Sequence, residues 1–274
     1  MGKLYVIGTP IGNLGDISPR AIETLRKVDF IAAEDTRVSI KLLQKFEIKK
    51  PLISYHEHNM RQRGGEILER ISGEESCAII TDAGMPCISD PGVELVKLCA
   101  QAGIEVIVVP GPSAVVSALA VSGLPTGRFS FEGFLSIKRS SRFEHLQSVK
   151  RDPRTLVFYE APHKLPAALR DMLEVLGDRN IALARELTKI HEEVWRTTLS
   201  EAAAYYLENP PRGEFVLVIE GAKETAKSVT LDEAVRLALQ LREEGKPISQ
   251  AAREAAKETG QKKGDIYRVL LAKE

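Results

Sequence analysis

The stretch of sequence that decides the fold is TDAGMPCISDPG, residues 81–92, which directly follows an apolar run at 77–80. A strand that ends in a loop rich in Gly and Pro and holding a carboxylate is how α/β proteins form a ligand crevice, because backbone without side chains can approach a ligand closely. A second loop of this kind, PGPS at 110–113, follows the apolar run at 106–109. Asp82 and Gly84 are therefore the first candidates for ligand contact.

The same pattern of strand, loop and helix extends over the first 122 residues. We expect strands at 4–7, 30–33, 52–54, 77–80 and 105–109, with helices at 18–28, 38–46, 61–71, 93–102 and 113–121. Such alternation indicates a mainly parallel sheet covered on both faces. The loops GTPIGN, EDTR, DAGMP and PGPS should then meet at one edge of this sheet.

The pattern changes after SGLPTG at 122–127, which is typical of a linker. An α+β unit is expected next, with strands at 128–135, 155–159, 180–185, 194–197 and 215–219 and helices at 166–176 and 199–208. Its segment 138–154 carries six Lys or Arg against two acids. We therefore expect an N-terminal α/β domain at 1–122 and a second domain at 123–222.

The remaining residues, 223–274, show no strand pattern and predict three helices at 231–243, 248–259 and 263–272. The spacing of Ala256, Gly260 and Ile266 is that of a helix-turn-helix, with a small residue for close contact, a glycine at the turn and an apolar anchor. Any three-helix bundle could show the same spacing. This module is expected to pack or to contact nucleic acid.

Charge and cysteine content exclude some classes of protein. Lys+Arg and Asp+Glu are both 38, so contact with a polyanion requires a local patch rather than a global field. Cys77, Cys87 and Cys99 lack the spacing of metal ligands, and we expect reduced buried thiols and no metal. Neither a signal peptide nor an apolar run of about 18 residues is present, which favours a cytoplasmic protein without a membrane partner.

Common nucleotide and hydrolase motifs are missing from the sequence. GTPIGN is not the GxGxxG of a dinucleotide-binding fold, and no Gly-Lys-Ser/Thr of a P-loop occurs. GxSxG and HExxH are also absent, which argues against serine hydrolases and zinc proteases.

Seven blocks, in order along the chain, resemble the tetrapyrrole methylase superfamily and, within it, the ribosomal RNA small subunit methyltransferase I family. These blocks are GTPIGNLGDISPRA (8–21), AEDTR (33–37), SYHEHN (54–59), DAGMPCISDPG (82–92), VPGPSA (109–114), FYEAPHK (158–164) and ARELTKIHEE (184–193). The resemblance implies two α/β units of the class III methyltransferase type with a cleft between them, plus a small C-terminal helical module. It also implies a homodimer that uses S-adenosylmethionine to methylate the ribose 2′-oxygen of a cytidine in the decoding region of 16S rRNA, within the small ribosomal subunit.

A site for S-adenosylmethionine needs carboxylates, free backbone amides and bends in the chain, because this donor carries a sulfonium, an ammonium, a carboxylate and an adenine. The Gly/Pro loops provide these features. We expect the donor to contact Gly8, Pro10, Asp82, Ala83, Gly84, Pro86, Pro110, Gly111, Ser113 and Pro162.

Methylation of a ribose hydroxyl is an in-line displacement in which the hydroxyl loses its proton, so alignment and a nearby base can supply much of the catalysis. The candidate catalytic residues are Glu34, Asp35 and Glu186. Contacts to RNA are expected from Arg37, His58, Arg139, Arg142, Arg151, Arg185 and Lys189. For each of these charged residues, a salt bridge or a solvated face is the alternative.

Two other functions remain open at this point. One is a tetrapyrrole C-methyltransferase of the precorrin or uroporphyrinogen type, which acts on a ring carbon. The other is a ligand-sensing regulator whose C-terminal module binds DNA. Duplex binding by residues 223–274 alone would favour the regulator, whereas methyl transfer to a ribosomal subunit would favour the methylase.

Overall fold

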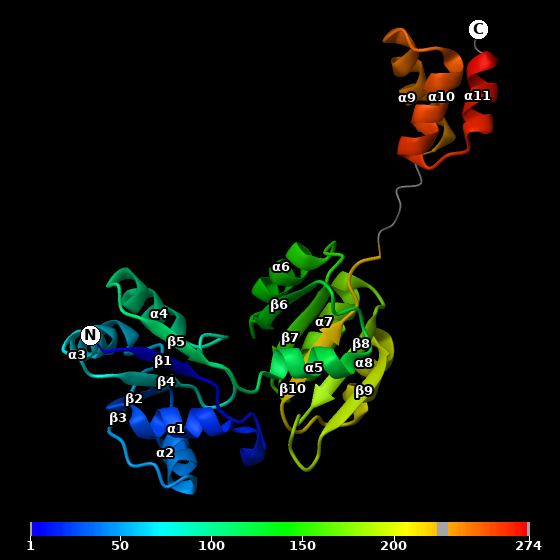
Figure 1. Ribbon diagram of the computed structural model, residues 1–274. Coiled ribbons are helices and arrows are strands. Elements are labelled where there is room, and N and C mark those ends of the chain that lie inside the picture. The colour runs from blue at the N-terminus through cyan, green and yellow to red at the C-terminus, as the bar shows by residue number, and fades with distance from the viewer. Residues whose placement is uncertain (1, 224–229, 273–274) are drawn as a thin grey trace. The chain divides into compact units, whose positions relative to one another are not determined.

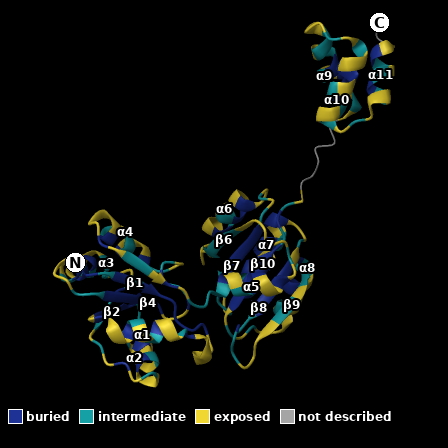
Figure 2. Ribbon diagram, in the orientation of Figure 1, coloured by how far each residue is buried: buried dark blue, intermediate teal, exposed yellow. Residues whose placement is uncertain are grey.

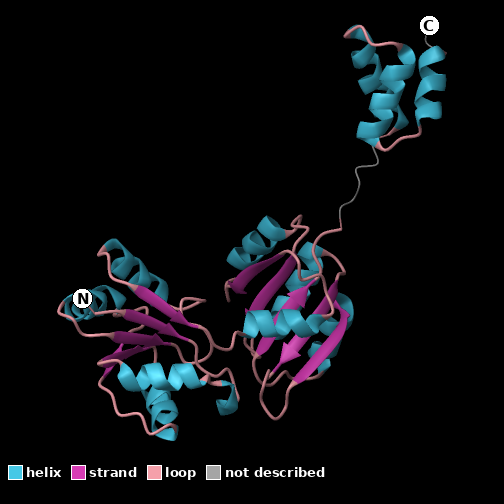
Figure 3. Ribbon diagram, in the orientation of Figure 1, coloured by secondary structure: helices cyan, strands magenta, loops and turns pink. Residues whose placement is uncertain are grey.

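The computed structural model describes residues 2–223 and 230–272 (Figure 1). The chain divides into two compact units, Met1–Ala222 and Lys223–Glu274. The first unit contains two five-stranded sheets, and the second contains helices (Figure 3).

The first sheet is parallel throughout, as the sequence predicts. Its strands lie in the order β3-β2-β4-β1-β5. They are β1 (Leu4–Ile7), β2 (Phe30–Ala33), β3 (Leu52–Ser54), β4 (Cys77–Ile80) and β5 (Val106–Val109). Every residue of β2 and β4 is buried, because helices cover both faces of the sheet (Figure 2).

Two helices pack on each face of this sheet. The helices are α1 (Pro19–Lys27), α2 (Thr36–Lys45), α3 (Met60–Ser72) and α4 (Gly92–Gln101), and a short 3₁₀ helix, η1 (Leu14–Asp16), precedes α1. One apolar cluster joins α1 and α2 to the sheet, and a separate cluster joins α3 and α4 to it. The predicted start of α1 is confirmed: Ser18 caps the helix by accepting a hydrogen bond from the Ala21 amide, and Pro19 is its first residue.

The three cysteines are free thiols. Cys77 and Cys99 are buried, as expected, whereas Cys87 is only half-buried. Burial raises the pKa of Cys87 and of Cys99 to about 11, so both thiols stay protonated at neutral pH.

The second sheet is mixed and has the order β6-β7-β10-β8-β9, in which β6 and β7 are parallel and the other neighbours antiparallel. The strands are β6 (Phe129–Phe134), β7 (Thr155–Glu160), β8 (Asn180–Arg185), β9 (Glu193–Thr198) and β10 (Phe215–Ile219). The helices of this half are α5 (Ala114–Ser122), α6 (Arg139–Val149), α7 (Leu165–Leu176) and α8 (Leu199–Glu208). One large apolar cluster joins α6, α7 and α8 to one face.

Helix α5 covers the other face of the second sheet. Its residues Val115, Ala118 and Leu119 pack against Val157 and Val218. The sequence analysis groups this helix with the first domain, because it follows β5 directly. Its apolar side chains instead pack beneath the second sheet, so α5 carries the chain from one sheet to the other.

The basic segment 138–154 forms helix α6, and the structure contradicts the prediction that Arg142 contacts RNA. Arg142 is 7% exposed. Its Nε and Nη2 lie 2.8 and 2.5 Å from Oδ2 of Asp171, which is fully buried in α7. Its Nη1 donates to the carbonyls of Ser136 and Ile137. Arg142 therefore links α6 to α7 and is closed to an external phosphate.

The C-terminal unit contains α9 (Leu231–Glu243), α10 (Ile248–Thr259) and α11 (Lys263–Leu271). Thr230 and Glu233 form a capping box at the start of α9. Ala252, Ala255 and Ile266 are completely buried, and Gly260 ends α10 in the left-handed conformation with φ 71°. Gly260 and Ile266 provide the predicted turn and apolar anchor, whereas Ala256, the predicted close contact, is half-buried against this core. In the parts of the chain that the structure describes, no helix is long and apolar enough to span a bilayer.

Candidate functional site

The three Gly/Pro loops of the first sheet converge, as the sequence predicts. The amide of Gly8 donates to the carbonyl of Val109 at 3.1 Å, and Thr9 and Gly84 exchange backbone hydrogen bonds of 2.9 and 3.2 Å. A Cβ added to Gly8 would lie 2.7 Å from the Cα of Gly111, which is too close for any side chain. Glycine is therefore required where the loop after β1 crosses the loop after β5.

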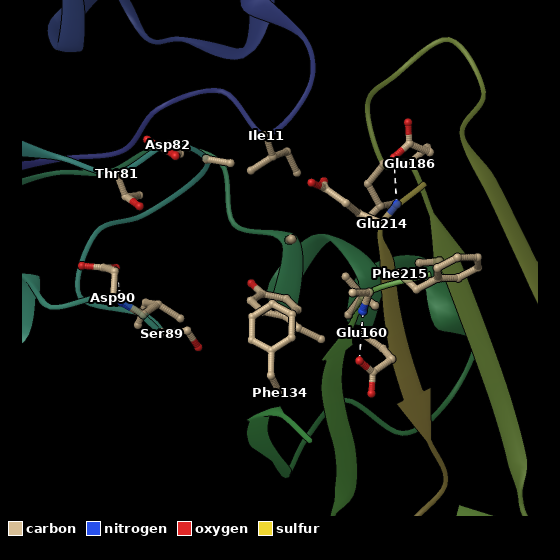
Figure 4. Close-up of a pocket in the computed structure, with 18 of the residues that line it drawn as sticks. Ile11, Thr81, Asp82, Ser89, Asp90, Phe134, Glu160, Glu186, Glu214 and Phe215 are labelled. Carbon is tan, nitrogen blue, oxygen red and sulfur yellow. Dashed lines mark hydrogen bonds between the residues drawn. The ribbon is translucent and has the colours of Figure 1, made fainter. Parts of the chain in front are cut away.

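A cavity of about 480 Å³ lies beside these loops (Figure 4). Residues from the loops after β1, β2 and β4 form one part of its wall, and residues at the ends of β7, β8 and β10 form another. The lining consists of Ile11, Glu34, Thr81, Asp82, Ala83, Ile88, Ser89, Asp90, Ala114, Phe134, Tyr159, Glu160, Ala161, Pro162, Ala184, Glu186, Leu187, Lys189, Glu214, Phe215 and Val216. The two α/β halves of the first unit thus share one cavity.

The cavity is strongly acidic. Its lining carries six carboxylates, those of Glu34, Asp82, Asp90, Glu160, Glu186 and Glu214, against the ammonium of Lys189. Lys164, outside the lining, pairs with Glu160 at 2.8 Å. Figure 4 shows Asp82 and Asp90 on one side of the cavity and Glu186 and Glu214 on the other. This excess of negative charge favours a cationic ligand and opposes entry of a phosphate.

Asp82 and Glu34 lie at the ends of neighbouring strands of the first sheet. Oδ1 of Asp82 accepts a hydrogen bond from the Asp35 amide at 3.1 Å, and Oε2 of Glu34 accepts one from the Thr81 hydroxyl at 2.5 Å. Burial raises the pKa of Asp82, and the hydrogen bond from the Asp35 amide lowers it. The negative charges of Glu34 and Asp35 raise it further, so the net shift is upward. A cation placed beside Asp82 would stabilise the ionised carboxylate and so lower its pKa. The same attraction would contribute to binding of the cation.

Asp35 does not line the cavity. Its carboxylate accepts the Arg37 amide at the start of α2 and forms a paired contact with the Arg37 guanidinium, whose Nη2 lies 2.6 Å from Oδ2. These bonds lower the pKa of Asp35 to about 2. A carboxylate held in this way is a weak base, and the contacts of Asp35 favour a role in capping the helix.

Glu186, Lys189 and Glu214 form an ion-paired group at the end of β8. Nζ of Lys189 lies 2.8 Å from Oε1 of Glu186 and 3.1 Å from Oε2 of Glu214. The hydrogen bonds from Lys189 and from the Glu214 amide lower the pKa of Glu186. Burial lowers the pKa of Lys189. The hydrogen bonds and negative charges of Glu186 and Glu214 have a larger effect in the opposite direction, so the pKa is raised overall.

The backbone is strained on both sides of the cavity. Cys87 and Ser89 have φ of 70° and 67°, and Glu186 and Thr188 have φ of 51° and 66°, in a region that residues other than glycine rarely adopt. Ser89 and Glu186 line the cavity directly. Strained residues persist where the surrounding structure fixes them, and they concentrate at functional sites.

The predicted donor-binding residues divide into two groups. Asp82, Ala83 and Pro162 line the cavity, and Pro10 lines a smaller neighbouring hollow of about 250 Å³ together with Asp82. The remaining ones belong to the converging loops behind the cavity wall: Gly8, Gly84, Pro86, Pro110, Gly111 and Ser113.

The predicted RNA contacts are not gathered in one place. Lys189 lines the cavity, and Arg185 lies at the end of β8, where its Nη2 pairs with Glu193 at 2.9 Å. Arg139 is exposed on α6 and pairs with Glu174 at 3.0 Å. The others, Arg37, His58 and Arg151, are exposed.

Several lining residues were missed by the sequence analysis. Asp90 could have been predicted from the sequence, because it belongs to the stretch 81–92 and is a carboxylate that follows a strand. Glu214, Phe215 and Phe134 gave no local signal. The register of the second sheet, in which Phe215 pairs with both Glu160 and Arg185, brings them to the cavity. Among the described residues, no group of three or more His, Cys, Asp or Glu is arranged to hold a metal ion.

Comparison with known proteins gives matches over the whole chain. The family described as Tetrapyrrole (Corrin/Porphyrin) Methylases matches residues 3–203, and the family described as RsmI C-terminal HTH domain matches residues 229–274. The "Ribosomal RNA small subunit methyltransferase I" of Synechocystis sp. is 50% identical over 273 residues, which cover 99% of this chain and 98% of that protein.

Two further matches bear on the fold. The Thermotoga maritima protein of the same name is 51% identical over 221 residues, which are 81% of this chain and 99% of that protein. The crystal structure of uroporphyrin-III-C-methyltransferase from Thermus thermophilus superimposes with a TM-score of 0.57 at 19% identity, covering 80% of this chain and 94% of that chain. At this identity the structural match shows the shared fold alone.

Proposed function

Because the chain belongs to the ribosomal RNA small subunit methyltransferase I family, we propose that it methylates the ribose 2′-oxygen of a cytidine in the decoding region of 16S rRNA. S-adenosylmethionine is the proposed donor, the small ribosomal subunit the proposed partner and the cytoplasm the proposed location. The sequence resemblance further supports a homodimer, which sedimentation of the full chain would test.

The acidic cavity is the observation that supports this donor. S-adenosylmethionine carries a sulfonium and an ammonium, and the cavity offers six carboxylates against one lysine. Its volume of about 480 Å³ falls within the usual range of about 300–1,000 Å³ for small-molecule sites. The residues present therefore fit the group. When bound, the donor supplies an electrophilic methyl carbon on sulfur.

Asp82 is proposed to attract the cationic part of the donor, because its carboxylate lines the cavity and has a raised pKa that a neighbouring cation would relieve. Pro10, Ala83 and Pro162 would contribute shape. The backbone crossing of Gly8, Gly84 and Gly111, with the turns at Pro86, Pro110 and Ser113, would hold Asp82 in place.

Glu34 is the proposed general base. Its carboxylate lines the cavity, is half-buried and is oriented by the Thr81 hydroxyl, so it can accept the proton of a ribose hydroxyl that enters the cavity. Glu186 is fixed by Lys189 and by the Glu214 amide and would orient the ribose. Arg37, His58, Arg139, Arg151, Arg185 and Lys189 remain proposed RNA contacts, whereas Arg142 does not.

One experiment tests the reaction as a whole. The protein is incubated with methyl-labelled S-adenosylmethionine and either small subunits, free 16S rRNA, uroporphyrinogen III or duplex DNA. Label on the ribose of a decoding-region cytidine, lost in Glu34→Gln, supports the proposal. Label on a tetrapyrrole carbon, or duplex binding without any methyl transfer, would overturn it.

A further inference from the structure

We propose that a groove beside the cavity binds the bases of single-stranded RNA next to the target nucleotide. This groove, called the aromatic groove below, consists of two adjoining hollows of about 500 and 440 Å³ between α8, β9 and the loop before β10. Its residues are Pro162, His163, Pro166, Arg185, Glu193, Trp195, Tyr205, Tyr206, Leu207, Asn209, Pro210, Pro211 and Arg212. The inference rests on the proposed function for the identity of the RNA.

The aromatic groove adjoins the cavity. Pro162 lines both the cavity and the first hollow, and Tyr206, Pro210 and Pro211 line both hollows. Arg185 in the second hollow directly precedes Glu186 in the cavity wall. An RNA strand whose target ribose enters the cavity would therefore have its neighbouring nucleotides beside this groove.

Rings available for stacking are present in the groove. The Trp195 and Tyr205 ring centroids are 5.0 Å apart, and so are those of Tyr205 and Tyr206. Tyr206 is anchored in turn against Phe215 at 5.8 Å. Tyr205 is 49% exposed although it belongs to this cluster. A rigid aromatic ring with an open face is a platform on which any base can stack.

The charges of the groove suit a phosphate chain better than those of the cavity. The groove contains Arg185, Arg212 and His163 against one acid, Glu193, whereas the cavity carries six carboxylates. Arg185 uses Nη2 to pair with Glu193, but its buried Nε has no hydrogen-bond partner in the described structure. Arg212 is exposed. The exposed guanidinium of Arg212 can therefore donate hydrogen bonds to a phosphate or a base edge, whereas the unpaired Nε of Arg185 lies beneath the groove surface.

This combination favours RNA over a protein as the occupant. Stacking rings, the exposed guanidinium of Arg212 and a position next to the cavity match successive nucleotides of one strand. The target nucleotide of that strand must separate from its neighbours to reach Glu34. The acidic cavity itself offers no attraction for phosphates, so the strand needs a binding surface just outside it.

Trp195 is the only tryptophan of the chain, which gives a readout that does not depend on methyl transfer. The full-length protein is titrated with single-stranded hexacytidylate while Trp195 emission is followed, and the affinity is measured independently by anisotropy of labelled hexacytidylate. We expect the emission to change on binding. We also expect Tyr205→Ala to weaken binding about 10-fold, since loss of one stacked base has an effect of this order.

Two variants serve as controls. Tyr205→Phe retains the ring and should bind within about 2-fold of wild type, if stacking dominates as it does in other single-strand sites. Phe129→Ala removes a 40% exposed aromatic residue from the opposite edge of the same sheet and should leave binding unchanged. In methyl transfer to small subunits, Tyr205→Ala should raise KM more than it lowers kcat.

Unchanged affinity in Tyr205→Ala, or unchanged Trp195 emission at saturation, would overturn the inference. So would sedimentation showing that Tyr205→Ala dissociates a dimer, because the groove would then be covered by a second copy of the chain. Binding of hexacytidylate at the groove without methyl transfer to any RNA would leave the groove as an RNA site while removing the proposed reaction.

Discussion

At the scale of single residues, the site depends on carboxylates whose neighbours differ. Asp35 is neutralised by Arg37, and its pKa falls to about 2. The pKa of Asp82, one strand away, is raised, chiefly by partial burial and then by the nearby acids Glu34 and Asp35. The two residues look alike in sequence, as carboxylates that follow parallel strands. Their partners make Asp35 a helix cap and leave Asp82 available to a cation.

The first prediction concerns Asp82→Asn. Loss of the charge should weaken binding of S-adenosylmethionine by about 10- to 100-fold at neutral pH, the usual effect of a hydrogen bond to a charged group. In the wild type, affinity should fall as pH decreases through the raised pKa of Asp82, because protonation removes its charge. In Asp82→Asn this fall should be reduced. Calorimetric titration at neutral and mildly acidic pH measures both effects.

The unliganded protein should not be destabilised by Asp82→Asn. A carboxyl whose pKa is higher in the folded than in the unfolded state disfavours folding once it is ionised, so the melting temperature at neutral pH should stay the same or rise. Wild-type affinity in the variant would remove Asp82 from the donor site.

A second prediction at this scale concerns the crossing of Gly8 and Gly111. In Gly8→Ala the new Cβ would meet the backbone of Gly111 at 2.7 Å, so the loops must separate. We expect a loss of about 1–3 kcal/mol in the free energy of unfolding, typical of overpacking, together with loss of donor binding. Urea unfolding and calorimetry measure these changes.

The matched control is Gly65→Ala, which lies within α3 and whose added Cβ would meet no atom within 4 Å. This variant should gain up to about 1 kcal/mol from helix propensity and bind the donor normally. Equal behaviour of the two variants would show that the loop crossing tolerates a side chain.

At the scale of elements, helix α6 shows how a basic segment can contribute to the packing between two helices. Its Arg142 is buried against Asp171 of α7, while Arg139 is exposed on the same helix. Counting charges along 138–154 treats these residues as equal, but only Arg142 is buried, although both arginines contact Asp171. Reversal of Arg142 would therefore test folding and not RNA binding.

The corresponding prediction is that Arg142→Met destabilises the protein by about 3 kcal/mol or more, because it leaves the fully buried Asp171 without its main partner. The double variant Arg142→Met with Asp171→Leu should recover most of this loss, since no buried charge then remains. Urea unfolding of both variants measures the coupling. A loss below about 1 kcal/mol in the single variant would mean that water or Arg139 replaces Arg142.

At the scale of the whole molecule, the C-terminal unit is separable from the catalytic one. Lys223–Glu274 forms its own compact unit with its own apolar core. The Thermotoga maritima relative matches 221 residues of this chain over 99% of its own length, so it is shorter by about the length of this unit.

We therefore predict that a protein ending at Ala222 binds S-adenosylmethionine with wild-type affinity and retains most of its methyl transfer to small subunits. Compared with the full chain, the thermal unfolding of the shortened protein should lack only the transition of the helical unit. The transition of the α/β unit should remain unchanged. Calorimetry and label transfer measure these properties. Loss of donor binding on truncation would show that the helices complete the cavity.

The sequence by itself determined most of the elements and the loops of the site. Parallel strands that end in Gly/Pro loops form a local pattern, and the carboxyl ends of such strands meet at one edge of the sheet. The convergence of Gly8, Gly84 and Gly111 could therefore be predicted. The blocks of residues also sufficed to identify the family. In the C-terminal unit, the spacing of Ala256, Gly260 and Ile266 reflects contacts between adjacent helices and was equally readable.

Only the tertiary structure decided which side chains share the cavity and which charges are neutralised. Glu214 and Phe215 reach it through antiparallel pairing with β7 and β8, and α5 packs on the second sheet although it follows the first. Burial of Arg142 depends on Asp171 in another helix. Such contacts join residues far apart in the chain, and their energies depend on packing and desolvation that no local pattern records.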